Sequence, residues 1–299
     1  MSDPGVPPPL RATDLAAARV AVVGLGLMGG SLAAALKTRG ACAQVIGVPR
    51  RAETVEQALA RGYIDRGTVH LEEGLAEADL VVLAMPVRAI LATLPRLGTI
   101  LPAGSLLLDL GSTKARIAQA MNALPGHLHV CPAHPMCGKE VAGLDAADPD
   151  LYVGKTFVLS PLLRTSPEAL ALAVALVRAV GARPCRIDPR RHDRLVAVGS
   201  HLPYLLALGL VATAEEVGRE DTWLWDLVAS GFRDTSRLAA SDVRMMLDVL
   251  MTNVEAIGEA MDRFREHIEE MEHLLKEGDE AALRRILEAA AIRRSAVFR

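Results

Sequence analysis

Short apolar runs alternate with helical stretches in the first 186 residues of the chain. Glycine closes two of the helical stretches, GSLAAALKTRG (30–40) and ETVEQALARG (53–62), as is common where helices stop. Continuous apolar strands separated by helices are typical of a parallel sheet covered on both faces. The runs are RVAVVGL (19–25), AQVIGV (43–48), ADLVVLAMP (78–86), SLLLDLG (105–111), HVCPAHP (129–135) and TFVLSP (156–161).

The strand pattern ends at CRIDP (185–189), and long helical patterns follow. We therefore predict an α/β domain over 19–186, a Rossmann-type doubly wound parallel sheet that binds a dinucleotide. An all-α substrate and dimerisation domain is predicted over 187–299, and the Pro-rich residues 1–18 are predicted to be a mobile tail. The three helical patterns cover 191–217, 242–278 and 279–295.

The helical half carries a long apolar stripe. A helix of this length, with no strands to cover it, must bury the stripe on other helices, either in its own chain or in a partner. We expect a homodimer through this half, because one small helical domain offers few partners. The stripe consists of Met246, Leu250, Val254, Ile257, Met261, Ile268, Met271 and Leu275.

The stretch GLGLMG fits the pattern G-x-G-x-x-G and lies between a predicted strand and a predicted helix. Gly24 allows the tight turn, Gly26 lets the backbone approach a pyrophosphate, and Gly29 lets the helix pack on the strand. Leu27 and Met28 open the helix, whose N-terminal amides attract phosphate. The turn is predicted to bind a dinucleotide, although a glycine turn without a ligand has the same local pattern.

A site selective for NAD usually places a carboxylate about 20 residues further on, at the end of the second strand, to hold the ribose hydroxyls. Here the strand is followed by Pro49, Arg50 and Arg51, with no carboxylate. Two guanidinium groups suit a 2′-phosphate, so we favour NADP over NAD, although both arginines can also be simply solvated.

Composition narrows the other possibilities. A formal net charge of −3 argues against a partner that is nucleic acid or an anionic membrane. No uninterrupted apolar run reaches the length of a membrane span, and the first residues do not look like a signal peptide. The four cysteines show no paired spacing, so we expect reduced thiols in a cytoplasmic protein, and we expect no metal site.

Five stretches, taken in order, closely resemble the prephenate/arogenate dehydrogenase family of tyrosine biosynthesis, and the resemblance runs from about residue 19 to about residue 262. It implies an NAD(P)-dependent oxidative decarboxylation of a cyclohexadienyl substrate, prephenate to 4-hydroxyphenylpyruvate. The ordered set is far more specific than any one motif. The stretches are GLGLMGGSLA (24–33), LDLGSTKARI (108–117), AHPMCGKEVAG (133–143), RHDRLVAVGSHLPYLLA (191–207) and SGFRDTSRLAASD (230–242).

The resemblance assigns roles to three residues. His134 matches the catalytic base, and its ordinary pKa suits proton transfer near neutral pH. Ser112 matches a serine that hydrogen-bonds near the substrate hydroxyl and the nicotinamide. Arg237 matches the arginine that clamps the ring carboxylate with two donors. Taken alone, these residues also fit a loop histidine, a helix N-cap and a surface arginine.

Four residues of one predicted helix match family positions that line the substrate and nicotinamide cleft. His192, Ser200 and His201 are the first three, although histidines on an apolar helix are often only core groups. Tyr204 is a departure, because many prephenate users have SHLPH where this chain has SHLPY. That histidine is associated with recognition of the pyruvyl side chain, so arogenate use or dual specificity is the alternative.

Two more distant hypotheses remain. A β-hydroxyacid dehydrogenase has a similar glycine turn and a helical second domain, but also a catalytic lysine that we do not find in the second half. A non-catalytic NADP-sensing protein needs the fold alone, and has no use for His134, Ser112 and Arg237 together. Fold analogy does not separate these hypotheses, whereas the site residues do.

Overall fold

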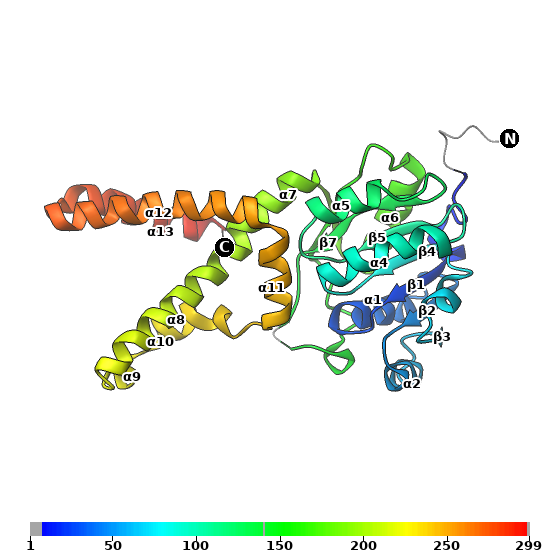
Figure 1. The fold of residues 1–299 in the computed structure, drawn as a ribbon, viewed down its shortest axis with the longest axis horizontal. Helices are drawn as coiled ribbons and strands as arrows, with labels where there is room; N and C mark the ends of the chain where they lie inside the picture. The colour runs from blue at the N-terminus through cyan, green and yellow to red at the C-terminus, as the bar shows by residue number, and fades with distance from the viewer. Residues whose placement is uncertain (1–7, 140, 298–299) are drawn as a thin grey trace.

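A six-stranded parallel sheet forms the centre of the first domain (Figure 1). The computed structural model describes residues 8–139 and 141–297. The strand order is β3-β2-β1-β4-β5-β6, and every neighbouring pair is parallel, so the predicted doubly wound Rossmann-type sheet is confirmed. The strands are β1 (Arg19–Val23), β2 (Gln44–Val48), β3 (Arg66–Gly67), β4 (Leu80–Leu83), β5 (Leu106–Asp109) and β6 (His129–Cys131).

Helices cover both faces of this sheet, which is why its strands are apolar throughout. In β1, Val20 and Val22 belong to one apolar core, whereas Ala21 and Val23 belong to the core on the opposite face. This alternation follows from the period of two along a strand. The helices are α1 (Leu27–Thr38), α2 (Ala52–Ala60), α3 (Leu71–Leu75), α4 (Val87–Ile100), α5 (Ala115–Asn122) and α6 (Pro167–Ala179).

A second, three-stranded sheet was not predicted. The run at 129–135 divides at Pro132, and the strand after it pairs antiparallel with the next strand along the chain rather than joining the main sheet. Pro132 has no N–H for a ladder, and its carbonyl accepts a hydrogen bond from Ser160 N at 2.8 Å. The strands, in the order β7-β8-β9, are β7 (Ala133–Pro135), β8 (Thr156–Leu159) and β9 (Arg183–Arg186).

The N-terminal segment from residue 8 onward is packed against the first domain, so the predicted mobile tail is wrong for residues 8–18; residues 1–7 lie outside the described residues. Pro8 O lies 2.8 Å from His129 Nε2, and Arg11 N donates to Gly104 O at 3.1 Å. Leu15, in the short helix η1 (Leu15–Ala17), is buried in the core. These contacts with distant residues leave no local pattern in the sequence.

The second half of the described chain consists of helices. In Figure 1, α12 and α13 run side by side away from the sheet, and α8 diverges from them, with α10 packed along it. Its apolar core is small, centred on Ala197, Leu202, Ile257 and Ala260. The elements are α7 (Pro189–Val196), a π-helical turn η3 (Ala197–His201), α8 (Leu202–Glu220), α9 (Leu224–Leu227), α10 (Ser230–Ser236), η4 (Arg237–Ala240), α11 (Val243–Thr252), α12 (Val254–Glu277) and α13 (Glu280–Val297).

The apolar stripe predicted for one long helix is divided between two. Asn253 separates α11 from α12, so Met246 and Ile257 are buried in different parts of the helical core. Further along α12 the stripe faces outward, and Ile268 and Leu275 are 42% and 68% exposed. Within this one chain the helical half therefore leaves an extended apolar surface uncovered.

The continuous helical stretch Pro189–Glu220 is long and apolar enough to cross a membrane by length and composition alone, with a mean hydropathy of 1.8 in its most apolar window. The sequence pattern had not suggested this. The same stretch carries His192 and Asp193, both buried against the first domain. About a third of the apolar window, 33%, is buried inside the chain.

Candidate active site

The glycine turn has a geometry that only glycine allows at two of its positions. Gly24 has φ +96°, and a Cβ there would lie 2.4 Å from Ala84 O. A Cβ on Gly29 would lie 1.8 Å from Gly24 O, so the first turn of α1 rests directly on the loop. A Cβ on Gly26 would meet nothing within 4 Å. The turn thus has no room for a side chain at Gly24 and Gly29, and has free space next to Gly26.

The N-terminus of α1 offers free amides beside this opening. The first intrahelical bond runs from Gly30 N to Gly26 O at 2.8 Å, so the amides of Leu27, Met28 and Gly29 precede it. The helix has no side-chain cap. Unpaired amides at the positive end of a helix suit a diphosphate, and the residues present therefore fit a dinucleotide.

The end of β2 lies next to this turn, because Gly24 N donates to Val48 O at 3.0 Å. Pro49 follows, and then Arg50 and Arg51, which are both exposed. Neither arginine forms an ion pair or a side-chain hydrogen bond with the described residues. Two guanidinium groups are therefore available where the adenosine ribose of a dinucleotide lies in this fold.

His134 lies on β7 and is held by a second histidine from the helical half. Its Nδ1 is 2.9 Å from Nε2 of His192, and the two rings meet edge to face with their centroids 5.1 Å apart. His192 is 1% exposed, and its Nδ1 is 2.8 Å from Asp193 Oδ1. Three side chains therefore form a chain of hydrogen bonds that crosses from one domain to the other.

Asp193 also caps helix α5 of the first domain. Its Oδ1 accepts from Lys114 N at 2.7 Å, and its Oδ2 accepts from Ala115 N at 2.8 Å. Ser112 therefore does not serve as the cap, and its hydroxyl makes no hydrogen bond with the described residues. The helix is capped from the other domain, which leaves the Ser112 hydroxyl available to a ligand.

A buried ion pair supports the loop before α5 and the start of β7. The side chains of Lys114 and Asp109 are both fully buried and in contact. Lys114 Nζ also donates to Ala133 O at 2.7 Å, while Asp109 accepts from Ala133 N at 3.1 Å and from Gly111 N at 2.8 Å. Both backbone groups of the residue before His134 are thus fixed by this pair.

These surroundings keep His134 neutral. Burial, and then the neighbouring His192 and Lys114, hold the pKa of His134 well below its ordinary value of 6.5. A neutral imidazole has one free lone pair, so it can act as a base. His134 Nε2, opposite the atom bonded to His192, makes no hydrogen bond with the described residues.

The π turn at Ala197–His201 changes which side chains are buried. A regular helix would place Ser200 and His201 next to each other near the same face. A π turn contains one extra residue, and here His201 points inward while Ser200 is exposed. His201 Nδ1 is 3.2 Å from Asn253 Nδ2, and burial lowers the pKa of His201 to about 4. His201 is thus buried beside Asn253, and its role toward the substrate stays a prediction.

A pocket of about 210 Å³ lies between the β7–β8 edge and the helix that carries His192. Ser200 lines it, and so does Val158, the register partner of His134 across β7 and β8. The remaining lining residues are Met136, Thr156, Ile187, His192, Leu195, Val196 and Gly199.

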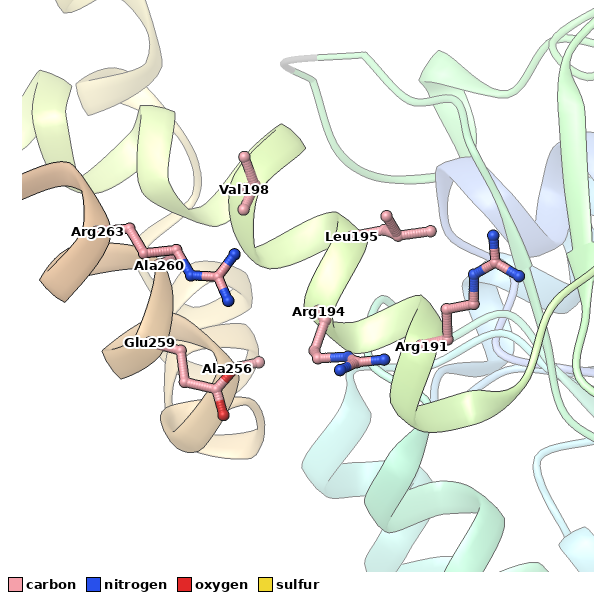
Figure 2. A pocket seen from close by; sticks show the side chains of 8 residues that line it. All are labelled: Arg191, Arg194, Leu195, Val198, Ala256, Glu259, Ala260 and Arg263. Carbon is pink, nitrogen blue, oxygen red and sulfur yellow. The ribbon is translucent and has the colours of Figure 1, made fainter. Parts of the chain in front are cut away.

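A larger cavity, of about 270 Å³, lies between α7 and α12 (Figure 2). The side chains of Arg191, Arg194 and Arg263 border it together with Glu259. None of the predicted site residues lines this cavity, so we place the chemistry in the smaller pocket beside His134.

Tyr204 and Arg237 lie farther along the helical half. Tyr204 is buried with Met246 and Val249, and Leu238 packs against this cluster. Arg237 is exposed at the start of η4, which packs on α8. The structure therefore places Arg237 beside the cluster around Tyr204.

Four residues that hold the site together were missed from the sequence. They are Asp109, Lys114, Asp193 and Asn253. Asp193 directly follows His192 in RHD, and Asp109 and Lys114 flank Ser112 in DLGSTK, so nearness to a proposed site residue was the available signal. Asn253 Nδ2 donates to Asp193 O at 2.8 Å, and nothing in its local sequence indicates this.

A Rossmann sheet with an open glycine turn, and a neutral histidine held beside a pocket, define the protein as a nicotinamide-dependent dehydrogenase. Residues 32–185 match the model of the prephenate dehydrogenase nucleotide-binding domain, and residues 188–289 match that of the prephenate dehydrogenase dimerization domain. The chain belongs to the prephenate dehydrogenase family.

Individual relatives agree with this assignment. Prephenate dehydrogenase of Lactococcus lactis is 32% identical over 274 residues, which are 90% of this chain and 75% of that protein. The structure of Aquifex aeolicus prephenate dehydrogenase in complex with hydroxyphenyl propionate and NAD+ has a TM-score of 0.88 and 29% identity, and covers 94% of this chain and 98% of that one. Synechocystis arogenate dehydrogenase has a TM-score of 0.83 and 31% identity, with coverage of 93% and 99%.

Proposed function

We propose that this protein oxidises and decarboxylates prephenate to 4-hydroxyphenylpyruvate, with NADP as the preferred acceptor. The observation that carries the proposal is the neutral, partly exposed His134, held through Nδ1 by His192 so that Nε2 remains free to take a proton. Membership of the prephenate dehydrogenase family supplies the substrate class.

A bound NAD(P)+ supplies the acceptor for the hydride that leaves the carbinol carbon of the substrate. His134 Nε2 accepts the hydroxyl proton as the carbonyl forms. When the ring carboxylate leaves as CO2, its bonding electron pair stays in the ring, which becomes aromatic, and the carbonyl oxygen becomes a phenolate. Protonated His134 then returns its proton to that oxygen, so the histidine ends the cycle neutral.

Ser112 and the glycine turn complete the site in this proposal. The Ser112 hydroxyl is free of the helix cap and positions the substrate hydroxyl beside the nicotinamide. Gly24, Gly26, Leu27, Met28 and Gly29 hold the diphosphate through the open backbone of the turn and the first amides of α1.

The preference for NADP rests on Arg50 and Arg51. Both are exposed after the end of β2, and a dianionic 2′-phosphate gives them a partner that NAD lacks. The structure of the relative from Aquifex aeolicus contains NAD+. The preference of this chain for NADP therefore has to be tested directly.

Substrate recognition is assigned to Arg237, Ser200 and Tyr204, while His192 lines the pocket with both ring nitrogens bound to Asp193 and His134. Arg237 is proposed to bind the ring carboxylate, which prephenate and arogenate share. Tyr204 replaces the histidine of many prephenate users, and its neutral phenol neither attracts the keto acid nor repels the ammonium group of arogenate. We therefore expect prephenate to be used with weak discrimination against arogenate.

We also propose a homodimer formed through the helical half. The exposed apolar residues of α11, α12 and α13 support it, because contiguous exposed apolar residues mark interaction surfaces. The second half matches a domain described as a dimerization domain. The four cysteines are all described and form no disulfide, and we keep the cytoplasmic location as part of the proposal.

The test is a steady-state assay of the wild-type protein with prephenate, arogenate and a panel of 3-hydroxyacids, each with NADP and with NAD. We expect the highest kcat/KM with prephenate and NADP, measurable turnover of arogenate, and none of the 3-hydroxyacids. Tyr204→His should shift the ratio of kcat/KM toward prephenate by about 10-fold or more, the scale of one hydrogen bond to a charged group. Exclusive use of arogenate would contradict the proposed substrate, and turnover of a 3-hydroxyacid alone would contradict the reaction.

A further inference from the structure

We infer that Asp193 and His192 form a relay that fixes the tautomer of His134, so that Asp193 is a positioning residue for the reaction. The three side chains are joined in series, Asp193 Oδ1 to His192 Nδ1 at 2.8 Å and His192 Nε2 to His134 Nδ1 at 2.9 Å. This inference rests on the proposed function of His134 as the base.

The proton positions in this series of hydrogen bonds follow from its one member that cannot donate, the Asp193 carboxylate. The Asp193 carboxylate only accepts, so His192 must carry its proton on Nδ1. With this one proton, His192 has a lone pair on Nε2, and that lone pair requires a proton on His134 Nδ1. His134 is left with its lone pair on Nε2, the atom that faces away from the relay and is free to accept the substrate proton.

The carboxylate is well placed to hold this arrangement. Asp193 is 3% exposed, and its remaining acceptor positions are taken by Lys114 N and Ala115 N at the N-terminus of α5. Asp193 thus lies at the N-terminus of the eight-residue helix α5 and accepts from its first amides. Its main-chain carbonyl is held by Asn253 Nδ2 at 2.8 Å, so both ends of the residue are fixed.

The relay also serves the charged state of the base. When His134 takes up the substrate proton, the positive charge is disfavoured by desolvation, by His192 and by Lys114. The Asp193 carboxylate is the negative charge at the far end of the hydrogen-bonded chain, as in other sites where a carboxylate orients and supports a catalytic histidine. Asp193 also caps the helix that follows the Ser112 loop, so the same residue helps to position Ser112 and His134.

The structure offers a matched control for the capping role. Asp248, on α11, is also buried, and its Oδ2 accepts from Arg88 N at 3.1 Å in the first turn of α4. Asp248 therefore joins the helical half to a helix of the first domain just as Asp193 does, but among the described residues it forms no hydrogen bond or ion pair with a histidine. Loss of either cap weakens the junction between the domains, whereas only loss of Asp193 releases His192.

The experiment compares Asp193→Ala with Asp248→Ala in the full-length protein. Both variants should lower the Tm. Asp193→Ala should also lower kcat with prephenate by about 100-fold or more, the scale of a lost base, with both KM values within about threefold of wild type. Asp248→Ala should keep kcat within about threefold. Equal kcat values in the two variants would overturn the relay.

A second measurement does not depend on the Asp193 and Asp248 variants. In wild-type protein labelled with ¹⁵N-histidine, the long-range ¹H–¹⁵N spectrum reports which ring nitrogen carries the proton, and His134 is assigned from the signals lost in His134→Asn. We expect His134 and His192 both protonated on Nδ1. A His134 protonated on Nε2 would overturn the relay whatever the enzyme does with prephenate. Absence of prephenate oxidation by wild type would instead contradict the proposed function.

Discussion

Replacement of Lys114 by methionine tests how the loop below the site is held. The change leaves the Asp109 carboxylate fully buried with its charge uncompensated, and it removes the bond from Lys114 Nζ to Ala133 O. Breaking a buried pair by removal of one partner costs about 3–5 kcal/mol. At about 2–4 °C per kcal/mol for a domain of this size, the Tm should fall by about 6–20 °C.

The assay is thermal and urea denaturation of the wild type, of Lys114→Met and of two comparison variants. Lys139→Met is the control, because the ion pair of Lys139 with Asp148 is about two-fifths exposed on both sides and should contribute about 1 kcal/mol or less. Asp109→Asn added to Lys114→Met removes the stranded charge, so the double variant should be more stable than Lys114→Met alone. If Lys114→Met costs no more than Lys139→Met, the pair does not support the loop as argued.

Three further predictions concern the cofactor, the histidines and the assembly. Arg50→Ala together with Arg51→Ala should reduce the ratio of kcat/KM for NADP over NAD by about 10-fold or more, and an unchanged ratio would contradict the 2′-phosphate assignment. His201 binds a proton near pH 4 when folded and near pH 6.5 when unfolded, so stability should be complete above pH 6.5 and fall between pH 6.5 and 4. Urea midpoints for His201→Gln should depend less steeply on pH in that window, and an equal slope would contradict it. Sedimentation at micromolar concentration should give a dimer, and a monomer would contradict the role assigned to the exposed stripe.

The sheet was predictable because its signal is local. The strands of the main sheet are buried on both faces, so each is a continuous apolar run. The second sheet was not predictable in this way, because a single proline at 132 divides one run between two sheets. The break at Asn253 and the docking of residues 8–18 likewise depend on partners far away in the chain.

The candidate site likewise has a part with a local sequence signal and a part that depends on distant residues. The glycine turn is local, and its sequence pattern located the strand, the turn and the helix together. His134 and Ser112 were predicted from motifs, but the residues that hold His134 and cap the helix after Ser112 lie elsewhere in the chain. Asp193 is 79 residues from the amide of Lys114 that it caps, and His192 is 58 residues from His134. Which residues join across the two domains follows from packing and not from spacing.

The central claim is that His134 is the base in an oxidative decarboxylation. It is tested most directly by the yield of NADPH and of CO2 from prephenate, measured together for wild type and for His134→Asn. We predict equal amounts of both products from the wild type, and a rate about 100-fold or more lower in a variant that keeps its Tm and its affinity for the cofactor. Near-normal turnover by His134→Asn, or NADPH without CO2 from the wild type, would contradict the account.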